Sequence, residues 1–190
     1  MKISKITGVI TGEFKYHTQV EGESFFFTDF KIEEGLTIPI QVSEYIKDSL
    51  TQDSKIRLTG YMSSCSLKNE QEDTKMFTFF KVCSYQDIED DAPVEKTINI
   101  GATVLNIFPM RVANNGLESL TIVGKEIDAA RYTSILHYTA KGRLARKLSA
   151  TLNKEDKIEG AGVLHKKKHS LEILISDLKV VDASNRKEES

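Results

Sequence analysis

The sequence predicts an all-β protein with short helices, arranged as two tandem five-stranded barrels. Three observations lead to this fold class. The chain has 190 residues, which is enough for one large domain or two small ones. Short runs rich in Val, Ile, Phe, Tyr and Thr, separated by Gly, Asn or charged loops, dominate it and are typical of strands. Finally, a segment of the first half recurs in the second half.

This repeat relates residues 50–60 to residues 152–162, at an offset of 102 residues. Both segments contain a Leu, an acidic residue, a Lys-Ile pair and a Gly in the same order. Short β-rich runs open the two halves at 6–10 and 98–104 and close them at 79–82 and 171–175. A chance match is the alternative, because few residues are identical, but the shared order and spacing favour duplication.

The two halves are separated by an acidic segment that ends at Pro93, and such a composition is typical of a solvated linker. We therefore expect a first domain at residues 1–88, a linker at 89–96, a second domain at 97–182 and a flexible tail at 183–190.

Each half contains five strand-like runs with one helical interval between the third and the fourth. In the first half the strands are expected at about 3–14, 23–32, 36–42, 55–64 and 75–85, with a helix at 43–50 that Ser43 is able to cap. In the second half they are expected near 97–110, 117–124, 132–140, 156–164 and 170–181.

The second helix is marked by Leu144, Leu148 and Leu152, which recur every four residues and place one apolar stripe against the barrel. Five strands with a helix between the third and the fourth is the layout of the OB-fold. The sequence therefore predicts two tandem OB-fold barrels.

Composition and motifs exclude several classes of protein. No stretch approaches the roughly 18 apolar residues of a membrane span, and the N-terminus lacks the apolar core of a secretory signal, so we expect a cytoplasmic protein. Two cysteines, Cys65 and Cys83, are too few for a disulfide scaffold. The four histidines are scattered, and no phosphate loop, nucleophile elbow or paired-carboxylate motif occurs, so we expect no metal, no cofactor and no enzymatic activity.

The charges are unevenly distributed although the net charge is only −2. Residues 1–91 hold 10 basic and 16 acidic side chains, a net charge of −6, whereas residues 92–190 hold 16 basic and 12 acidic ones, a net charge of +4. A basic half indicates a surface for a polyanion. The alternative is that small domains differ by a few charges by chance.

Three segments of the second half resemble bacterial single-stranded DNA-binding proteins. Residues 97–104 (TINIGATV) match the first strand of that family, residues 142–145 (GRLA) match its Gly-x-Leu-Ala entry into a helix, and residues 152–158 (LNKEDKI) match its Leu-x-Lys-Gly-Asp-x-Val turn, with Glu155 where Gly is usual. The first half follows the same plan more loosely. The sequence departs from the family in having no Trp and no acidic C-terminal peptide for recruiting partners.

The resemblance implies a protein that coats single-stranded DNA without sequence preference and protects it in replication, recombination or DNA transfer, for example that of a phage or mobile element. Because this family brings four OB units together, two units per chain imply a homodimer. The alternative function is a protein–protein adaptor of a replication or primosome complex with weak or no DNA binding. In that case the acidic first half binds a protein partner through its exposed phenylalanines.

Candidate DNA-binding residues in the first half are outward-facing aromatic and basic side chains. Strand alternation places Phe26, Phe30 and Ile32 inside the barrel and the neighbouring odd-numbered residues outside. The candidates are Phe25, Phe27, Lys31, Lys55, Arg57, Tyr61, Phe77 and Phe79. A dimer interface or a covering helix is the alternative explanation for these aromatic side chains.

The second half supplies mainly cations, which would contact phosphates. The candidates are Arg111, Arg131, Tyr132, Lys141, Arg143, Arg146, Lys147, Lys166, Lys167 and Lys168. The last three lie in the expected loop between the fourth and fifth strands, with which OB-folds commonly bind oligonucleotides. A solvated hairpin tip is the alternative for this lysine triplet.

Overall fold

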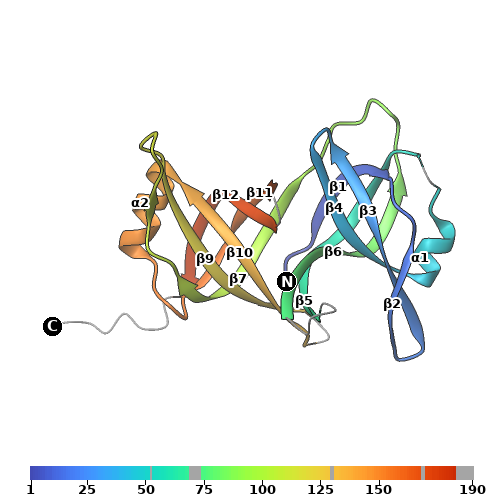
Figure 1. Ribbon diagram of the computed structural model, residues 1–190, viewed down its shortest axis with the longest axis horizontal. Coiled ribbons are helices and arrows are strands. Elements are labelled where there is room, and N and C mark those ends of the chain that lie inside the picture. The colour runs from blue at the N-terminus through green and yellow to red at the C-terminus, as the bar shows by residue number, and fades with distance from the viewer. Residues whose placement is uncertain (52, 69–73, 129–130, 168–169, 183–190) are drawn as a thin grey trace. The chain divides into compact units, whose positions relative to one another are not determined.

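The computed structural model describes residues 1–51, 53–68, 74–128, 131–167 and 170–182. The chain forms two compact units, whose main segments are Ile3–Thr97 and Ile98–His165. Met1 and Lys2 belong to the second unit. Both units are built from strands, with one short helix each (Figure 1). No helix in the described part of the chain is long and apolar enough to cross a membrane.

The first barrel is closed by pairing between its first and third strands. Its sheet order is β1-β5-β6-β4-β3-β2, and the additional β1–β3 pairing completes the ring. The elements are β1 Ser4–Ile10, β2 Lys15–Val20, β3 Glu23–Glu33, β4 Leu36–Ser43, α1 Glu44–Ser49, β5 Ile56–Lys68 and β6 Thr74–Asp87. Ser43 occupies the N-cap position of α1 as expected, but its side chain makes no capping hydrogen bond.

The second barrel repeats this topology. Its sheet order is β10-β12-β11-β7-β9-β8, and β9–β10 pairing closes it. The elements are β7 Thr97–Ile107, β8 Arg111–Val112, β9 Glu118–Ile127, β10 Thr133–Lys141, α2 Gly142–Thr151, β11 Lys157–Lys167 and β12 Ser170–Asp182. Helix α2 lies against β9 and β10 and buries Leu148 there, as its apolar stripe predicts (Figure 1).

The predicted fold class is confirmed: each unit is a closed barrel of five strands with its helix between the third and the fourth. Two additional strands, β2 and β8, were not predicted. Each pairs as an edge strand with the strand that follows it, so each unit has a six-stranded sheet. Both lie in segments of mixed polarity, where period-two alternation gives only a weak signal.

The two barrels can be aligned residue by residue through their registers. Val9 pairs with Lys31 in the first barrel as Thr103 pairs with Lys125 in the second. The structure explains why the repeat keeps a glycine, which is Gly60 in the first barrel. A Cβ at Gly60 would lie 2.0 Å from the carbonyl oxygen of Lys81, and one at its counterpart Gly162 would lie 2.7 Å from that of Leu174. Both barrels therefore need glycine at this close approach of two strands.

The interiors of the barrels differ at a matched position. Phe30 fills the first core, whereas the equivalent residue of the second is Gly124, where a Cβ would lie 2.7 Å from the ring of Tyr138. The Tyr138 hydroxyl donates a 2.6 Å hydrogen bond to Oε1 of Glu126, and both side chains are buried. Burial is the main cause that raises the pKa of Glu126. The second core thus contains a polar pair that the first core lacks.

Candidate nucleic-acid interface

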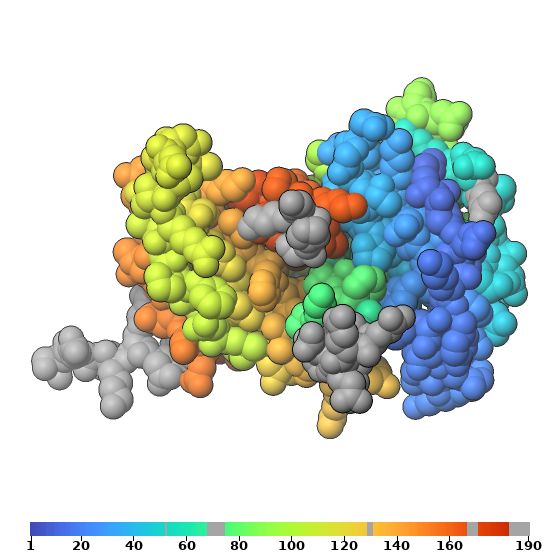
Figure 2. Space-filling model, in the orientation of Figure 1, coloured from blue at the N-terminus to red at the C-terminus, as the bar shows by residue number. Residues whose placement is uncertain are grey.

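The outer face of the first barrel carries several large aromatic side chains. Figure 2 shows the β2–β3 hairpin (blue) at the surface of this barrel. The register connects the outward residues across four strands: Phe27 lies opposite Gln41, Gln41 opposite Lys81, and Lys81 opposite Tyr61. Phe25, Phe77 and Phe79 lie on the same face by strand alternation. This face is therefore a continuous aromatic surface with a lysine in it.

Phe27 is the centre of an aromatic cluster that we define as His17, Phe27, Phe77 and Phe79. The ring centroid of Phe27 lies 5.2 Å from that of Phe77 and 5.0 Å from that of Phe79, both in edge-on geometry. The centroid of the His17 ring lies 4.3 Å from that of Phe27. The two distances between phenylalanine rings lie within the range of attractive aromatic pairs, and His17 is slightly closer. The cluster is thus held rigidly by β2, β3 and β6.

The members of the cluster differ in exposure. Phe79 is only 4% exposed, so it forms the floor of the cluster, while Phe27 and Phe77 are half-buried and keep part of their surface open. Burial lowers the pKa of His17, so its ring is neutral near pH 7. Of the four phenylalanine candidates in this barrel, Phe25, Phe27 and Phe77 can offer ring surface to a ligand, and Phe79 supports them.

Two lysines lie over phenylalanine rings on β3. The Nζ atom of Lys81 is 5.4 Å from the ring centroid of Phe25, and that of Lys47 is 5.0 Å from the centroid of Phe26. Both distances lie within the range of cation–π attraction. Lys81 was not among the sequence candidates, although continuing the alternation of Phe77 and Phe79 by two residues would have found it.

Phe26 corrects one sequence expectation. The alternation places it inside the barrel, and Phe30 and Ile32 are indeed buried there, but Phe26 is only half-buried. Its ring lies edge-on to Tyr16 at 5.9 Å. At this point β3 pairs with β2 as well as with β4, and Lys47 of α1 lies over the Phe26 ring, so Tyr16 and Lys47 cover this side chain only in part.

Three basic candidates of the first barrel form ion pairs or hydrogen bonds with residues outside the aromatic cluster. Lys31 pairs with Glu34 at 3.0 Å. Lys55 donates hydrogen bonds to the carbonyl oxygens of residues 90 and 92, at 2.5 and 2.7 Å, and Arg57 pairs with Glu95 at 2.6 Å. Lys55 and Arg57 thus fix the segment that follows β6, and none of the three joins the aromatic cluster.

The basic candidates of the second barrel are spread over three regions. Arg111 is exposed on β8, and Arg131 and Tyr132 are exposed in the turn before β10, where the Tyr132 N–H donates to Asp128 Oδ1 at 2.7 Å. Around α2, Lys141, Arg143 and Lys147 are exposed and Arg146 pairs with Glu118 at 2.7 Å. Lys166 is exposed near the end of β11, whereas the side chain of Lys167 and the whole of Lys168 lie outside the described residues.

The outer face of the second barrel has polar residues where the first has aromatic ones. The registers align Phe25 and Phe27 with Ser119 and Thr121, and Phe79 with Glu172. Glu172 is 5% exposed and accepts a 2.7 Å hydrogen bond from the hydroxyl of Thr139, while His165 Nδ1 lies 3.2 Å from its other oxygen. At these three aligned positions, only the first barrel has aromatic rings.

The described residues offer no site for a metal. Among them, no three His, Cys, Asp or Glu side chains come together in a way that could hold an ion. Cys65 and Cys83 are free thiols, and burial raises the pKa of Cys65.

Comparison with known proteins finds similarity in structure but not in sequence. No protein-family model and no curated protein matches the chain. Two crystal structures of the single-stranded DNA-binding protein from Thermus aquaticus match it. A deletion mutant has a TM-score of 0.76 at 14% identity over 100% of this chain and 98% of that one. The wild-type protein has a TM-score of 0.74 at 12% identity over 97% and 95%. At this identity the likeness establishes the tandem OB-fold.

Proposed function

We propose that the chain is a non-enzymatic protein that binds single-stranded DNA without sequence preference through the outer face of its first barrel. The observation that carries the proposal is the aromatic cluster around Phe27 with its half-open rings, next to Lys81 over Phe25. Ring faces bind any base, and a neighbouring ammonium group binds the phosphate between bases. The fold shared with the Thermus aquaticus protein supports the same function.

The geometry suits unstacked bases better than a duplex. Phe25 and Phe27 alternate along one strand, and Phe77 lies 5.2 Å from Phe27 on another, so successive bases can stack on rings from two strands. Each base stacked on an aromatic ring contributes about 1–3 kcal/mol, and a paired base inside a duplex exposes no face for such stacking. The buried Phe79 holds the rings in place and thereby limits the entropy lost on binding.

The second barrel contributes charge to the proposed complex. The exposed residues Arg111, Lys141, Arg143, Lys147 and Lys166 would contact phosphates. We further propose that two chains associate, so that four barrels act together, and that the protein protects single strands in replication, recombination or DNA transfer.

Fluorescence anisotropy with labelled oligo(dT), oligo(dA) and a duplex of equal length, at two salt concentrations, tests the proposal. We expect both single strands to bind more tightly than the duplex, with an affinity that falls as salt rises. Equal binding of single strands and duplex at low salt would contradict it. Since the same rings could instead be buried against a protein, that result would favour the adaptor function.

A further inference from the structure

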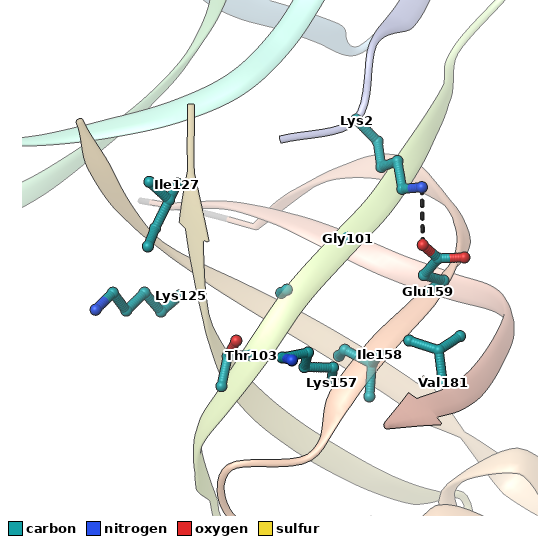
Figure 3. Close-up of a pocket in the computed structure, with 10 residues that line it drawn as sticks. Lys2, Gly101, Thr103, Lys125, Ile127, Lys157, Ile158, Glu159 and Val181 are labelled. Atoms are coloured by element: carbon teal, nitrogen blue, oxygen red, sulfur yellow. Dashed lines mark ion pairs between the residues drawn. The ribbon is translucent and has the colours of Figure 1, made fainter. Parts of the chain in front are cut away.

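A cavity on the second barrel is lined by strand residues and by Lys2, and by no residue of α2. Its volume is about 280 Å³, just below the range of about 300–1,000 Å³ for sites of drug-sized ligands, so it suits a small group. The walls come from β7, β9, β11 and β12, together with Lys2, which belongs to this compact unit (Figure 3). The residues that line it with charged or hydroxyl groups are Lys2, Thr103, Lys125, Lys157 and Glu159.

The cavity has an excess of positive charge. Three ammonium groups and one carboxylate line it. Glu159 pairs with Lys2 at 2.8 Å, the contact drawn in Figure 3, and Lys179 lies 3.9 Å from the same carboxylate. At the rim, Lys157 pairs with Asp182 at 2.7 Å. With Lys179 and Asp182 included, the site still carries two more positive than negative charges.

Lys125 is the cation whose charge is least compensated. Among the residues that the structure describes, it has no ion-pair partner, whereas the other two lysines of the cavity have one each. It lies directly opposite Thr103 in the β7–β9 ladder. In Figure 3 its ammonium end extends away from Thr103, so the Lys125 side chain would have to turn for both residues to contact one ligand. Ammonium and hydroxyl donors are the groups that bind phosphate oxygens.

The wall that carries Lys2 is fixed by buried contacts. The side chain of Lys2 crosses β7 at Gly101, where a Cβ would lie 2.7 Å from Lys2 Cγ. The buried carboxylate of Glu126 accepts hydrogen bonds from the backbone N–H groups of Lys2 and Gly101 as well as from Tyr138. The polar pair in the second core therefore holds the cavity wall in position.

We propose that this cavity binds a phosphate group, with Lys125 and Thr103 as its principal donors and with Lys157 and Lys2 adding charge. Glu159 opposes the ligand and also competes with it for Lys2. The phosphate can belong to a free phosphate ion or to the backbone of a nucleic acid, because both present the same oxygen atoms. The inference does not depend on base stacking by the first barrel.

Amide NMR of the whole ¹⁵N-labelled chain, titrated with inorganic phosphate and in parallel with chloride at matched ionic strength, tests the proposal. We expect saturable shifts of the Gly101, Thr103 and Lys125 amides with phosphate and not with chloride. Equal responses to both anions, or no saturable shift at these residues, would overturn it.

Two variants with opposite expected effects separate binding from a structural role. Lys125→Gln should weaken phosphate binding about fivefold, because it removes an uncompensated charge. Glu159→Gln should strengthen binding by a similar factor, because it removes the competing carboxylate. Lys154→Gln, in the turn between α2 and β11, makes the same charge change as Lys125→Gln outside the cavity and should have no effect. No weakening in Lys125→Gln, or weakening in Glu159→Gln, would refute the assignment.

Oligo(dT) then identifies the source of the phosphate. If a bound strand supplies it, the same amides shift with oligo(dT), and Lys125→Gln reduces the slope of log affinity against log salt by about 0.7. If oligo(dT) leaves these amides unchanged while inorganic phosphate shifts them, the site binds the free ion. The phosphate titration needs no DNA, so failure of the protein to bind single strands would not refute the phosphate site. Failure to bind phosphate would likewise not refute the binding of single strands by the first barrel.

Discussion

Exchanging Phe for Leu at two positions of one face separates DNA binding from stability. Phe25 is half-buried, and its recorded ring contact is the cation–π contact with Lys81, at 5.4 Å. Phe79 is 4% exposed and contacts the rings of Phe27 and Phe77 at 5.0 and 6.0 Å. Leu preserves apolar character at both positions but removes the flat ring face. We therefore expect Phe25→Leu to lower mainly the affinity for DNA, and Phe79→Leu to lower mainly the stability of the fold.

The expected magnitudes follow from these contacts. If one base stacks on Phe25, Phe25→Leu removes about 1–3 kcal/mol of binding free energy, a loss of affinity of roughly 5- to 150-fold. Its effect on stability is limited to one exposed cation–π contact, about 0.5–1 kcal/mol. Phe79→Leu loses two ring contacts of about 0.5–1.5 kcal/mol each and should lower the unfolding temperature by roughly 4–8 °C for every kcal/mol.

Anisotropy with oligo(dT) at fixed salt measures the first quantity, and thermal unfolding followed by circular dichroism measures the second. Each variant is the matched control of the other, because the chemical change is identical and the two residues share one face of the barrel. A folded Phe25→Leu variant that binds oligo(dT) as tightly as the parent would refute base stacking at Phe25. A Phe79→Leu variant with reduced affinity and unchanged unfolding temperature would refute the supporting role of Phe79.

Three further predictions concern the second barrel. Replacing residues 166–168 together by Ala should lower the affinity for oligo(dT) and the salt slope by up to about 0.7 per lysine, and an unchanged slope would remove this hairpin from the interface. Tyr138→Phe removes the 2.6 Å hydrogen bond to buried Glu126 and should cost about 1–3 kcal/mol in urea unfolding, whereas an unchanged midpoint would contradict the pairing. Because the pKa of Glu126 is raised in the folded state, ionising it destabilises the fold, so the wild type should lose stability relative to Glu126→Gln as pH rises above 4.5; a difference independent of pH would contradict this.

The architecture could be predicted from the sequence because it rests on local patterns. Alternation in β3 and β4 identified the buried Phe30, and the four-residue spacing of leucines identified α2 and its buried Leu148. The repeat in the sequence corresponds to a structural requirement, since Gly60 and Gly162 lie at equivalent close approaches of two strands. Strands, helices and the repeated glycine can be predicted because each depends on residues close together in the sequence or on a motif that occurs in both halves.

The candidate site was predictable only in part, because contacts between distant segments decide which side chains are open. Lys55 and Arg57 point outward as expected, but both side chains bind the segment that follows β6, Lys55 through a hydrogen bond and Arg57 through an ion pair. Phe79 also points outward, yet the rings of Phe27 and Phe77 cover it. The cavity lined by Lys125 was not foreseen, since its walls come from residues as far apart in the sequence as Lys2 and Val181.

The aligned registers explain how two barrels with one topology can perform different tasks. A core position tolerates exchange only if volume is conserved, and the loss of the Phe30 ring at Gly124 is matched by the gain of a ring at Tyr138. On the outer face, Phe79 corresponds to Glu172, and both side chains are almost fully buried. The rings of Phe27 and Phe77 cover Phe79, whereas the hydroxyl of Thr139 donates a hydrogen bond to Glu172, so each position is satisfied by different neighbours. In the function that we propose, the first barrel supplies ring faces for bases, and the second barrel supplies lysines and arginines for phosphates.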